Sequence, residues 1–270
     1  MRGGVRSGQG NWSPVTGPLA GCHYMGEMAR DLPEGEGACN LAGGAMYSGG
    51  WVAGRPQGLG VLRHAGGASY EGSFEGGLRH GTGAWFDDED GGEGGGEAGG
   101  GGLVGGGVRG GRRYEGEWRH DLMHGVGRGV EAAAAGVQLY EGEHAAGRRD
   151  GRGRCEYVRW GVACGGEAED GESRSAYDGE WAAGCRSGVG KVSLRLAPEL
   201  HVSGRWEGGA WLGVGEIRRC VRRGGIEVTR TLTLNSSPLT RPSHPLHPHF
   251  NGPTSSFRRW RVASWSTRAS

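Results

Sequence analysis

The stretch that decides the fold is YEGSFEGGLRHGTG, which runs from Tyr70 to Gly83. Its pattern is Y-x-G-x-[WF]-x-x-G-x-x-H-G-x-G, in which Tyr is position 0 and glycines stand at +2, +7, +11 and +13. Further units with this pattern begin at Tyr24, Tyr47, Tyr114, Tyr140, Tyr177 and, with Val in place of Tyr, Val202. Self-similarity of this kind indicates a protein built by stacking copies of one small structural unit.

The alternation inside each unit predicts a β-hairpin. Tyr at 0, Gly at +2 and Trp or Phe at +4 point to one face of an extended strand, because side chains alternate between faces. Positions +1 and +3 are mostly acidic, as at Glu115 and Glu117, and point to the other face. Gly at +7 and the His-Gly pair at +10 and +11 tolerate the positive φ of a tight reversal, after which a second strand begins at the G-x-G. A ring from the neighbouring unit is expected to fill the gap left by Gly at +2.

The composition agrees with this reading. Glycine accounts for 62 of 270 residues, against an ordinary level of about 7%, and 26 of these glycines stand at template positions, where only Asp31 and Asp121 depart. The hydrophobic fraction of 35% excludes one large aliphatic core. A single-layer sheet covered by Tyr and Trp does not need such a core.

The positions of the repeats along the sequence divide the chain into segments. Gly8-x-Gly10-x-Trp12 repeats the phase of Gly81-x-Gly83-x-Trp85, so the chain opens on the second half of a unit, either as a cap or because the gene model is truncated. An insertion at 164–175 resembles the flexible Gly-rich linker that follows the third unit. The predicted segments are a half-repeat cap (1–23), units one to three (24–90), the Gly-rich acidic linker (91–111), units four to seven (112–215), a terminal strand (216–234) and a disordered Ser/Pro/Arg-rich tail (235–270).

Several functional classes are disfavoured by the sequence. It has no apolar run of 18 residues and no apolar segment behind Met1, so we expect a cytoplasmic protein, cytoskeletal, ciliary or peripheral at a membrane. Six cysteines without a CxxC pair indicate free thiols rather than a zinc site. Gly188-Val-Gly-Lys191 lacks the first glycine and the Ser or Thr of a P-loop, and neither G-x-S-x-G nor HExxH occurs. We expect no catalytic residues, cofactor or metal, and a net charge of +1 disfavours nucleic acid.

The strings YEGSFEGGLRHGTG (70–83) and YEGEWRHDLMHGVG (114–127) resemble the MORN repeat, the membrane occupation and recognition nexus motif, and the resemblance covers about residues 24–215. It implies an all-β fold, an elongated single-layer antiparallel sheet of about seven solenoid-like hairpin repeats, with a groove lined by the Tyr and Trp positions. It also implies a scaffold or protein-interaction module, as in cilia and other cytoskeletal assemblies, in membrane junctions, or beside kinase or methyltransferase domains. This sequence departs from the pattern at Val202, Met28 and His144.

Two candidate surfaces follow. The aromatic side chains at positions 0 and +4 of the repeats form either the core of the stack or an open groove that binds a partner helix or peptide. The candidate groove residues are Tyr47, Trp51, Tyr70, Phe74, Tyr114, Trp118, Tyr177 and Trp181, of which Tyr70, Phe74, Tyr114 and Trp118 are predicted to be the exposed ones. The loop arginines either pair with the acidic face or form a rim for anionic lipid headgroups. The candidate rim residues are Arg55, Arg79, Arg119, Arg148, Arg149 and Arg186.

We therefore expect a non-enzymatic MORN-repeat scaffold that binds a protein partner, with self-association left open. The alternatives are a peripheral membrane module that binds anionic phospholipids such as phosphoinositides, and the MORN region of a longer lipid kinase or methyltransferase.

Overall fold

The computed structural model describes residues 4–14, 19–41, 43–88, 111–133, 136–159, 173–195, 199–223, 226–234 and 266–269. These residues form strands and turns, with no helix among them. The all-β class predicted from the repeats is thus confirmed. The chain divides into two compact units, Met1–Ala134 with His144–Gly147 (unit 1) and Ala135–Glu143 with Arg148–Ser270 (unit 2).

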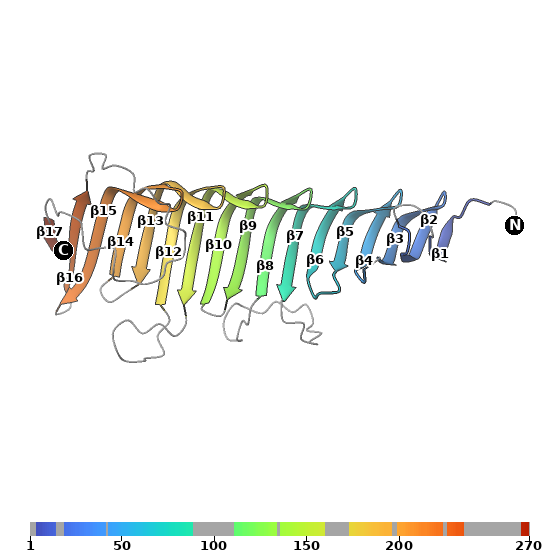
Figure 1. Cartoon of the computed structure of the whole chain (residues 1–270), viewed down its shortest axis with the longest axis horizontal. Helices are drawn as coiled ribbons and strands as arrows, with labels where there is room; N and C mark the ends of the chain where they lie inside the picture. Colours follow the sequence, from blue (N-terminus) through green and yellow to red (C-terminus); the bar gives the residue numbers. More distant parts are fainter. Residues whose placement is uncertain are drawn as a thin grey trace. The chain divides into compact units, whose positions relative to one another are not determined.

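Unit 1 is a single layer of antiparallel strands, each paired with the next along the chain (Figure 1). Its strands are β1 (Gly8–Trp12), β2 (His23–Ala29), β3 (Leu32–Asn40), β4 (Met46–Val52), β5 (Arg55–Arg63), β6 (Ser69–Glu75), β7 (Leu78–Asp88), β8 (Gly111–Arg119) and β9 (Leu122–Ala133).

Unit 2 repeats the arrangement, and its strands from β11 onward also pair antiparallel in chain order. They are β10 (Gly136–Ala145), β11 (Arg148–Arg159), β12 (Ser173–Ala182), β13 (Cys185–Arg195), β14 (Glu199–Glu207), β15 (Ala210–Arg223), β16 (Ile226–Leu234) and β17 (Ser266–Ala269). Most of the linker at 91–111, most of the insertion at 164–175 and most of the tail at 235–270 lie outside the described residues. Within the tail, β17 pairs with β16, although no strand is predicted there.

Each hairpin turns on two residues, at +6 and +7, and both have positive φ. Ala53 and Gly54 have φ values of 48° and 77°, and His120 and Asp121 have values of 48° and 67°. These are the backbone angles of a type I′ turn, whose twist matches that of antiparallel strands. The predicted positive φ at +7 is confirmed, including at the two positions where Asp replaces Gly, because Asp tolerates the left-handed region better than most residues.

The hairpin loop is shorter than predicted, because the second strand of every repeat begins at +8 rather than at the G-x-G. The glycine at +11 also has positive φ, 73° at Gly81 and 58° at Gly125, but it lies inside the strand. The pairing register shifts nearby, between Gly72 and Phe74 in the third repeat. The glycine at +11 therefore accompanies a β-bulge, which bends the strand, rather than the turn.

Glycines face glycines along the sheet. Gly72 (+2) pairs with Gly83 (+13) inside the third repeat, and Gly83 pairs in turn with Gly116 (+2) of the fourth. Strand β1 keeps the same register, since Gly10 pairs with Gly26 and Trp12 with Tyr24, as Trp85 pairs with Tyr114. Strand β1 thus occupies the place of the second strand of a repeat, as its sequence phase predicts.

Candidate functional site

The aromatic side chains of each unit pack edge-to-face. In unit 1 each +4 ring from Trp51 to Trp118 lies between the Tyr of its own repeat and the Tyr of the preceding one, with centroid distances of 5.0–5.3 Å. In unit 2 the order is Tyr140, Trp181, Tyr177, Trp206, at 5.2–5.4 Å. Interplanar angles of 77–89° are those of T-shaped pairs, which the ring quadrupole favours.

Each tyrosine ring lies against the +13 glycine of its own repeat. A Cβ added at Gly83 would overlap the Tyr70 ring, and a Cβ added at Gly127 would overlap the Tyr114 ring. The Tyr70 hydroxyl donates to the carbonyl of Ser73, at 3.0 Å, and so finds a partner although the ring is buried. The expectation that a ring from the neighbouring unit fills the gap at the +2 glycine is wrong, because a Cβ added at Gly72 would meet the backbone of the paired strand and the hydroxyl of the repeat's own Tyr70.

The neighbouring repeat contributes a hydrogen bond instead. The indole Nε1 of Trp118 donates to the carbonyl of Gly83, at 3.1 Å, and Trp181 does the same to Gly153, at 2.9 Å. The +4 tryptophan thus ties its repeat to the glycine row of the preceding one.

The eight predicted groove residues are all buried, with exposed fractions of 0–5%. Trp85 and Met123 pack against the cluster of buried rings in unit 1, which includes Tyr70, Phe74 and Trp118. The prediction that Tyr70, Phe74, Tyr114 and Trp118 are exposed is wrong, because edge-to-face packing and these neighbours exclude solvent. The structure places the rings in the core, which is the alternative that the sequence leaves open. We call this side of the strands, which carries positions 0, +2 and +4, the ring face.

Burial also changes the acidity of the tyrosines. Loss of hydration disfavours the phenolate and raises the pKa from 10.0 to about 12. The residues concerned are Tyr24, Tyr47, Tyr70, Tyr140 and Tyr177. Their hydroxyls therefore remain neutral hydrogen-bond donors at physiological pH.

The predicted arginine rim separates into two groups. Arg79, Arg149 and Arg186, all at +9, lie over rings of the core, for example 4.4 Å from the Trp118 centroid and 4.6 Å from that of Trp206. These three are cation–π partners of the ring face rather than members of an open rim, which corrects the prediction. The other three, Arg55, Arg119 and Arg148, flank the turns and are exposed.

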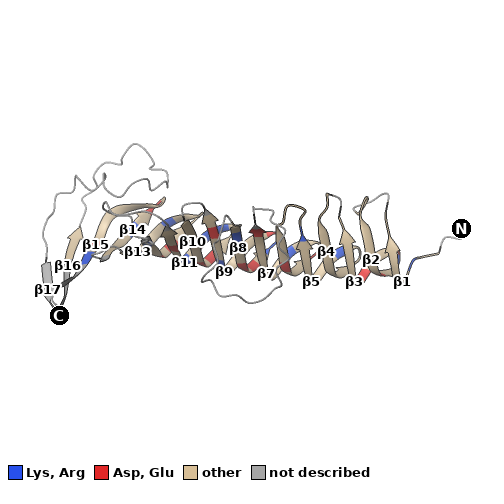
Figure 2. Ribbon diagram, turned by 90° about the horizontal axis from the view of Figure 1, so that it is seen from below, with Lys and Arg blue, Asp and Glu red and all other residues tan. Residues whose placement is uncertain are grey.

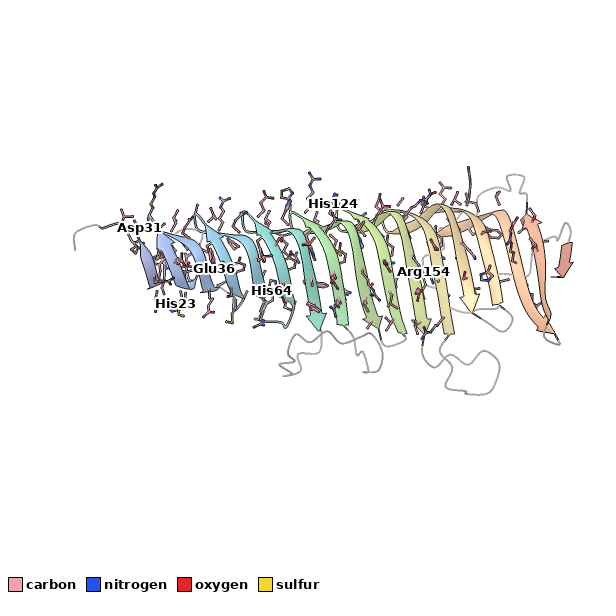
Figure 3. The ribbon with its side chains drawn as sticks, turned by 180° about the vertical axis from the view of Figure 1, so that it is seen from behind. His23, Asp31, Glu36, His64, His124 and Arg154 are labelled. Carbon is pink, nitrogen blue, oxygen red and sulfur yellow. The ribbon has the colours of Figure 1, made fainter. Side chains whose placement is uncertain are left out.

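A backbone hydrogen bond joins each turn to the repeat before it. The N–H at +7 donates to the carbonyl at +9 of the preceding repeat, at 2.9–3.1 Å, at all seven junctions. Where +7 is Asp, its carboxylate adds to the contact. Arg79 Nε donates to Asp121 Oδ1 at 3.0 Å, and Arg6 Nε donates to Asp31 Oδ1 at 2.8 Å. The hydrogen bonds from Arg6 lower the pKa of Asp31, which Figure 3 places at the turn end of the strands.

The opposite side of the strands, which carries positions +1, +3, +12 and +14, is the open face. Glu115 and Glu117, which are predicted there, are exposed, and Figure 2 shows both charge signs along β7–β9. At least one of these acidic side chains has a structural role, since Glu117 Oε1 accepts a hydrogen bond from the Val126 N–H next to the bulge, at 3.1 Å.

The open face of unit 1 is hollowed over β5–β8. The hollow has a volume of about 700 Å³ and a floor of glycine backbone. It is lined by Leu59, Val61, Glu71, Thr82, Ala84 and Glu115. Leu59, at +12, is 75% exposed. Sequence reasoning missed this hollow, because only the pairing of Leu59 with Ser73 and of Val61 with Glu71 shows that positions +12 and +14 lie on the same side as the acids.

The described residues contain no group of three or more His, Cys, Asp or Glu side chains arranged to hold a metal ion. Cys22, Cys39, Cys155 and Cys185 are free thiols. Among the described elements there is no helix with the length and apolar character needed to cross a membrane.

Comparison with protein families agrees with the repeat pattern. A model of the MORN repeat matches six segments, residues 24–46, 47–69, 70–88, 114–128, 140–162 and 177–193. The chain belongs to the MORN-repeat family. It is thus a repeat module for protein or membrane interaction. No curated protein matches the chain.

The structure adds a seventh MORN hairpin, which the family comparison does not match. Strands β14 and β15 pair Gly204 with Gly215, and Trp206 donates to the Gly190 carbonyl at 3.3 Å. Val202 replaces the tyrosine, and a Cβ at Gly204 would meet the indole nitrogen of Trp211 instead. A tryptophan from the second strand thus occupies the space beside this glycine.

The other residues that depart from the MORN pattern, at the +4 position, are also buried in the core. His144 is buried at the +4 place of the fifth repeat, with its ring 5.1 Å from that of Tyr114 in an edge-to-face arrangement. Met28 is buried at the same place of the first repeat. The ring stack of unit 1 therefore continues through His144.

Proposed function

We propose that this MORN-repeat chain is a non-enzymatic scaffold that binds a protein partner on the open face of unit 1. The observation that supports the proposal is the division of the two faces. The rings are buried, whereas the open face has a hollow with an exposed leucine at its wall. A binding surface needs groups that a partner reaches, and apolar side chains among polar ones are typical of such surfaces.

The lining suggests the chemistry of the partner. Leu59, Val61 and Ala84 offer apolar contact, and Glu71 and Glu115 stand on either side of Ala84 in the same row. The glycine floor carries no side chain that would keep a partner away from the backbone. A segment with apolar side chains beside a Lys or Arg complements this lining, because the basic group meets the two carboxylates.

Matched substitutions on the open face test the proposal. Leu59→Asp alters the hollow, whereas Val189→Asp alters the same +12 position in unit 2, where the side chain is 60% exposed. Both changes lie on exposed surface, so both variants should fold. We expect quantitative capture from cell extracts to yield proteins that bind the wild type and Val189→Asp but not Leu59→Asp, and the purified partner to show the same order of affinity. Equal binding by both variants would contradict the proposal.

The setting that we propose is a cytoskeletal or ciliary assembly, supported by the family alone. Microscopy of the tagged full chain tests it, because co-localisation with microtubule or axonemal structures is expected. A diffuse distribution would contradict it.

A second candidate function, binding to an anionic membrane, is favoured by the turn end of unit 1. Exposed Arg55 is paired with exposed Val52 across one turn, and exposed Arg119 with exposed Leu122 across another. Basic and apolar side chains together suit a lipid surface.

Vesicle flotation tests this second candidate. Vesicles with phosphoinositide should retain the protein and neutral vesicles should not. Arg55→Ala with Arg119→Ala should weaken retention by about thirtyfold, at about 1 kcal/mol per arginine. Equal flotation with both vesicle types would remove this candidate.

A further inference from the structure

The junctions between consecutive turns differ in how they satisfy the donors at +9. At two junctions of unit 1 an Arg at +9 meets an Asp at +7 of the next repeat, and one carboxylate oxygen accepts from both the N–H and the Nε of that Arg. The two hydrogen bonds measure 3.0 and 2.8 Å between Arg6 and Asp31, and 3.0 and 3.0 Å between Arg79 and Asp121. A carboxylate suits two convergent donors of this kind, one of them charged.

Two further junctions of unit 1 omit the donor and the acceptor together. Pro33 and Pro56 stand at +9, and the +7 residues that follow them are Gly54 and Gly77. Proline has no N–H to donate. At these four junctions, therefore, an Asp at +7 accompanies an N–H at +9, and a Gly at +7 accompanies a proline.

Arg186 in unit 2 keeps the donors of the first kind of junction, but the +7 residue that follows it is Gly209. Its Cζ atom lies 5.6 Å from the Tyr177 centroid and 4.6 Å from the Trp206 centroid. The corresponding distances for Arg79, to its own tyrosine and to the next tryptophan, are 5.7 and 4.4 Å. The Arg186 side chain thus has the position from which Arg79 binds its carboxylate, and among the described residues no carboxylate forms an ion pair with Arg186.

The other junctions with Gly at +7 lack this combination. Met123, which precedes Gly147, has no basic side chain. Arg149, which precedes Gly184, donates from Nη1 to Cys155 Sγ at 3.6 Å. Arg186 is therefore the residue at which the donors of an Arg–Asp junction face a glycine.

The turn in front of Arg186 has room for a carboxylate. A Cβ added at Gly209 would meet nothing within 4 Å. The φ of Gly209 is 85°, close to the values of 68° and 67° at Asp31 and Asp121, so the backbone follows the same path at all three positions. Arg186 and Gly209 are half-buried and Gly208 beside them is exposed, which leaves the donors within reach of a group from outside the chain.

We propose that Arg186 and the turn at Gly209 bind the carboxylate of an Asp side chain supplied by a partner protein, in the place that Asp121 takes in unit 1. We call this site the carboxylate seat. The Arg186 N–H and Nε donate to one carboxylate oxygen, as the same groups of Arg79 do. Stacking on the Trp206 ring fixes the guanidinium, so less side-chain entropy is lost on binding. The seat lies at the turn end of unit 2, so the inference does not rest on the function proposed for the open face of unit 1.

Titration with a blocked peptide, followed by NMR, tests the carboxylate seat. N-acetyl-Gly-Asp-Gly-amide has a side-chain carboxylate and no charged end, and N-acetyl-Gly-Asn-Gly-amide is its neutral match. In the isotope-labelled full chain at constant ionic strength, the Asp peptide should shift the N–H and Nε–H signals of Arg186 saturably, and the Asn peptide should not. Arg79 is the internal control, because Asp121 already accepts from its donors and its signals should stay in place.

Two reciprocal substitutions localise the binding. Gly209→Asp supplies the carboxylate from within the chain, so peptide binding at Arg186 should weaken by about tenfold or more. Asp121→Gly removes the internal carboxylate in unit 1 and should make the signals of Arg79 respond to the peptide. Both variants should fold, because Asp and Gly both occur at +7 in this chain. An Arg186 that does not respond to the Asp peptide, or that responds equally in Gly209→Asp, would overturn the proposal.

Other anions show which carboxylate the seat accepts. Inorganic phosphate and N-acetyl-Gly-Gly-Gly, whose charge is its terminal carboxylate, are titrated over the same concentrations. Weaker binding of both than of the Asp peptide supports the proposal. Tighter binding of phosphate would overturn it in favour of a phosphorylated ligand, and tighter binding of the terminal carboxylate would overturn it in favour of a chain end.

Discussion

At the scale of the residue, the pairing of one tyrosine with one glycine recurs in six of the repeats. Gly83 has no side chain because the ring of Tyr70 occupies the space where a Cβ would stand. The parity of positions 0, +2 and +4 predicts that Tyr, Gly and Trp share a face. Parity cannot predict which tyrosine covers which glycine, because that depends on the tilt of the ring across the strand pair and on the bulge.

Titration of the tyrosines should show how far they are buried. Folding raises their pKa from 10.0 to about 12, so the unfolded chain loses these protons first as the pH rises. Titration of these tyrosines should not change the free energy of unfolding below about pH 10. The free energy of unfolding should fall as the pH rises from about 10 towards about 12. Melting temperatures followed by circular dichroism across that range, with tyrosinate absorbance recorded in parallel, check the expectation. Tyrosinate formed near pH 10 in a protein that stays folded would contradict it.

At the scale of the element, the hairpin combines two kinds of positive-φ position that look alike in the sequence. Glycine at +7 belongs to a type I′ turn, whereas glycine at +11 accompanies a bulge inside the following strand. Both require glycine or a tolerant residue for the same steric reason. The sequence therefore predicts the reversal but not the start of the second strand, because glycine alone does not distinguish a turn from a bulge.

The turns offer a direct test through their +6 position. Ala183 has a φ of 50°, a conformation that costs an L-residue other than Asn, Asp or Gly roughly 1 kcal/mol. Ala183→Asn should therefore raise the free energy of unfolding by about 0.5–1 kcal/mol, and Ala183→Val should lower it by a similar amount or more. Urea titration of both variants against the wild type measures the difference. A ranking in which Val is better tolerated than Asn would exclude the type I′ turn.

At the scale of the whole molecule, the MORN repeats separate a buried ring face from an accessible open face in each unit. Repeat number, phase and family are predicted from the sequence, because they depend on spacing alone. The location of a binding surface is not, because Tyr114 and Trp118 have the same spacing whether they form a core or line a groove. Burial of both rings decides between these alternatives, and it directs attention to the open face.

The central claim is that a tyrosine ring seated on a glycine of its own repeat stabilises each hairpin, and Gly83→Val compared with Gly10→Val tests it most directly. Both glycines stand at +13 and neither has positive φ, so backbone strain is the same for both. The account predicts that Gly83→Val loses about 3 kcal/mol or more of unfolding free energy, because the added side chain displaces the Tyr70 ring, while Gly10→Val changes it by less than about 0.5 kcal/mol. Equal effects of the two substitutions in urea unfolding would contradict the account.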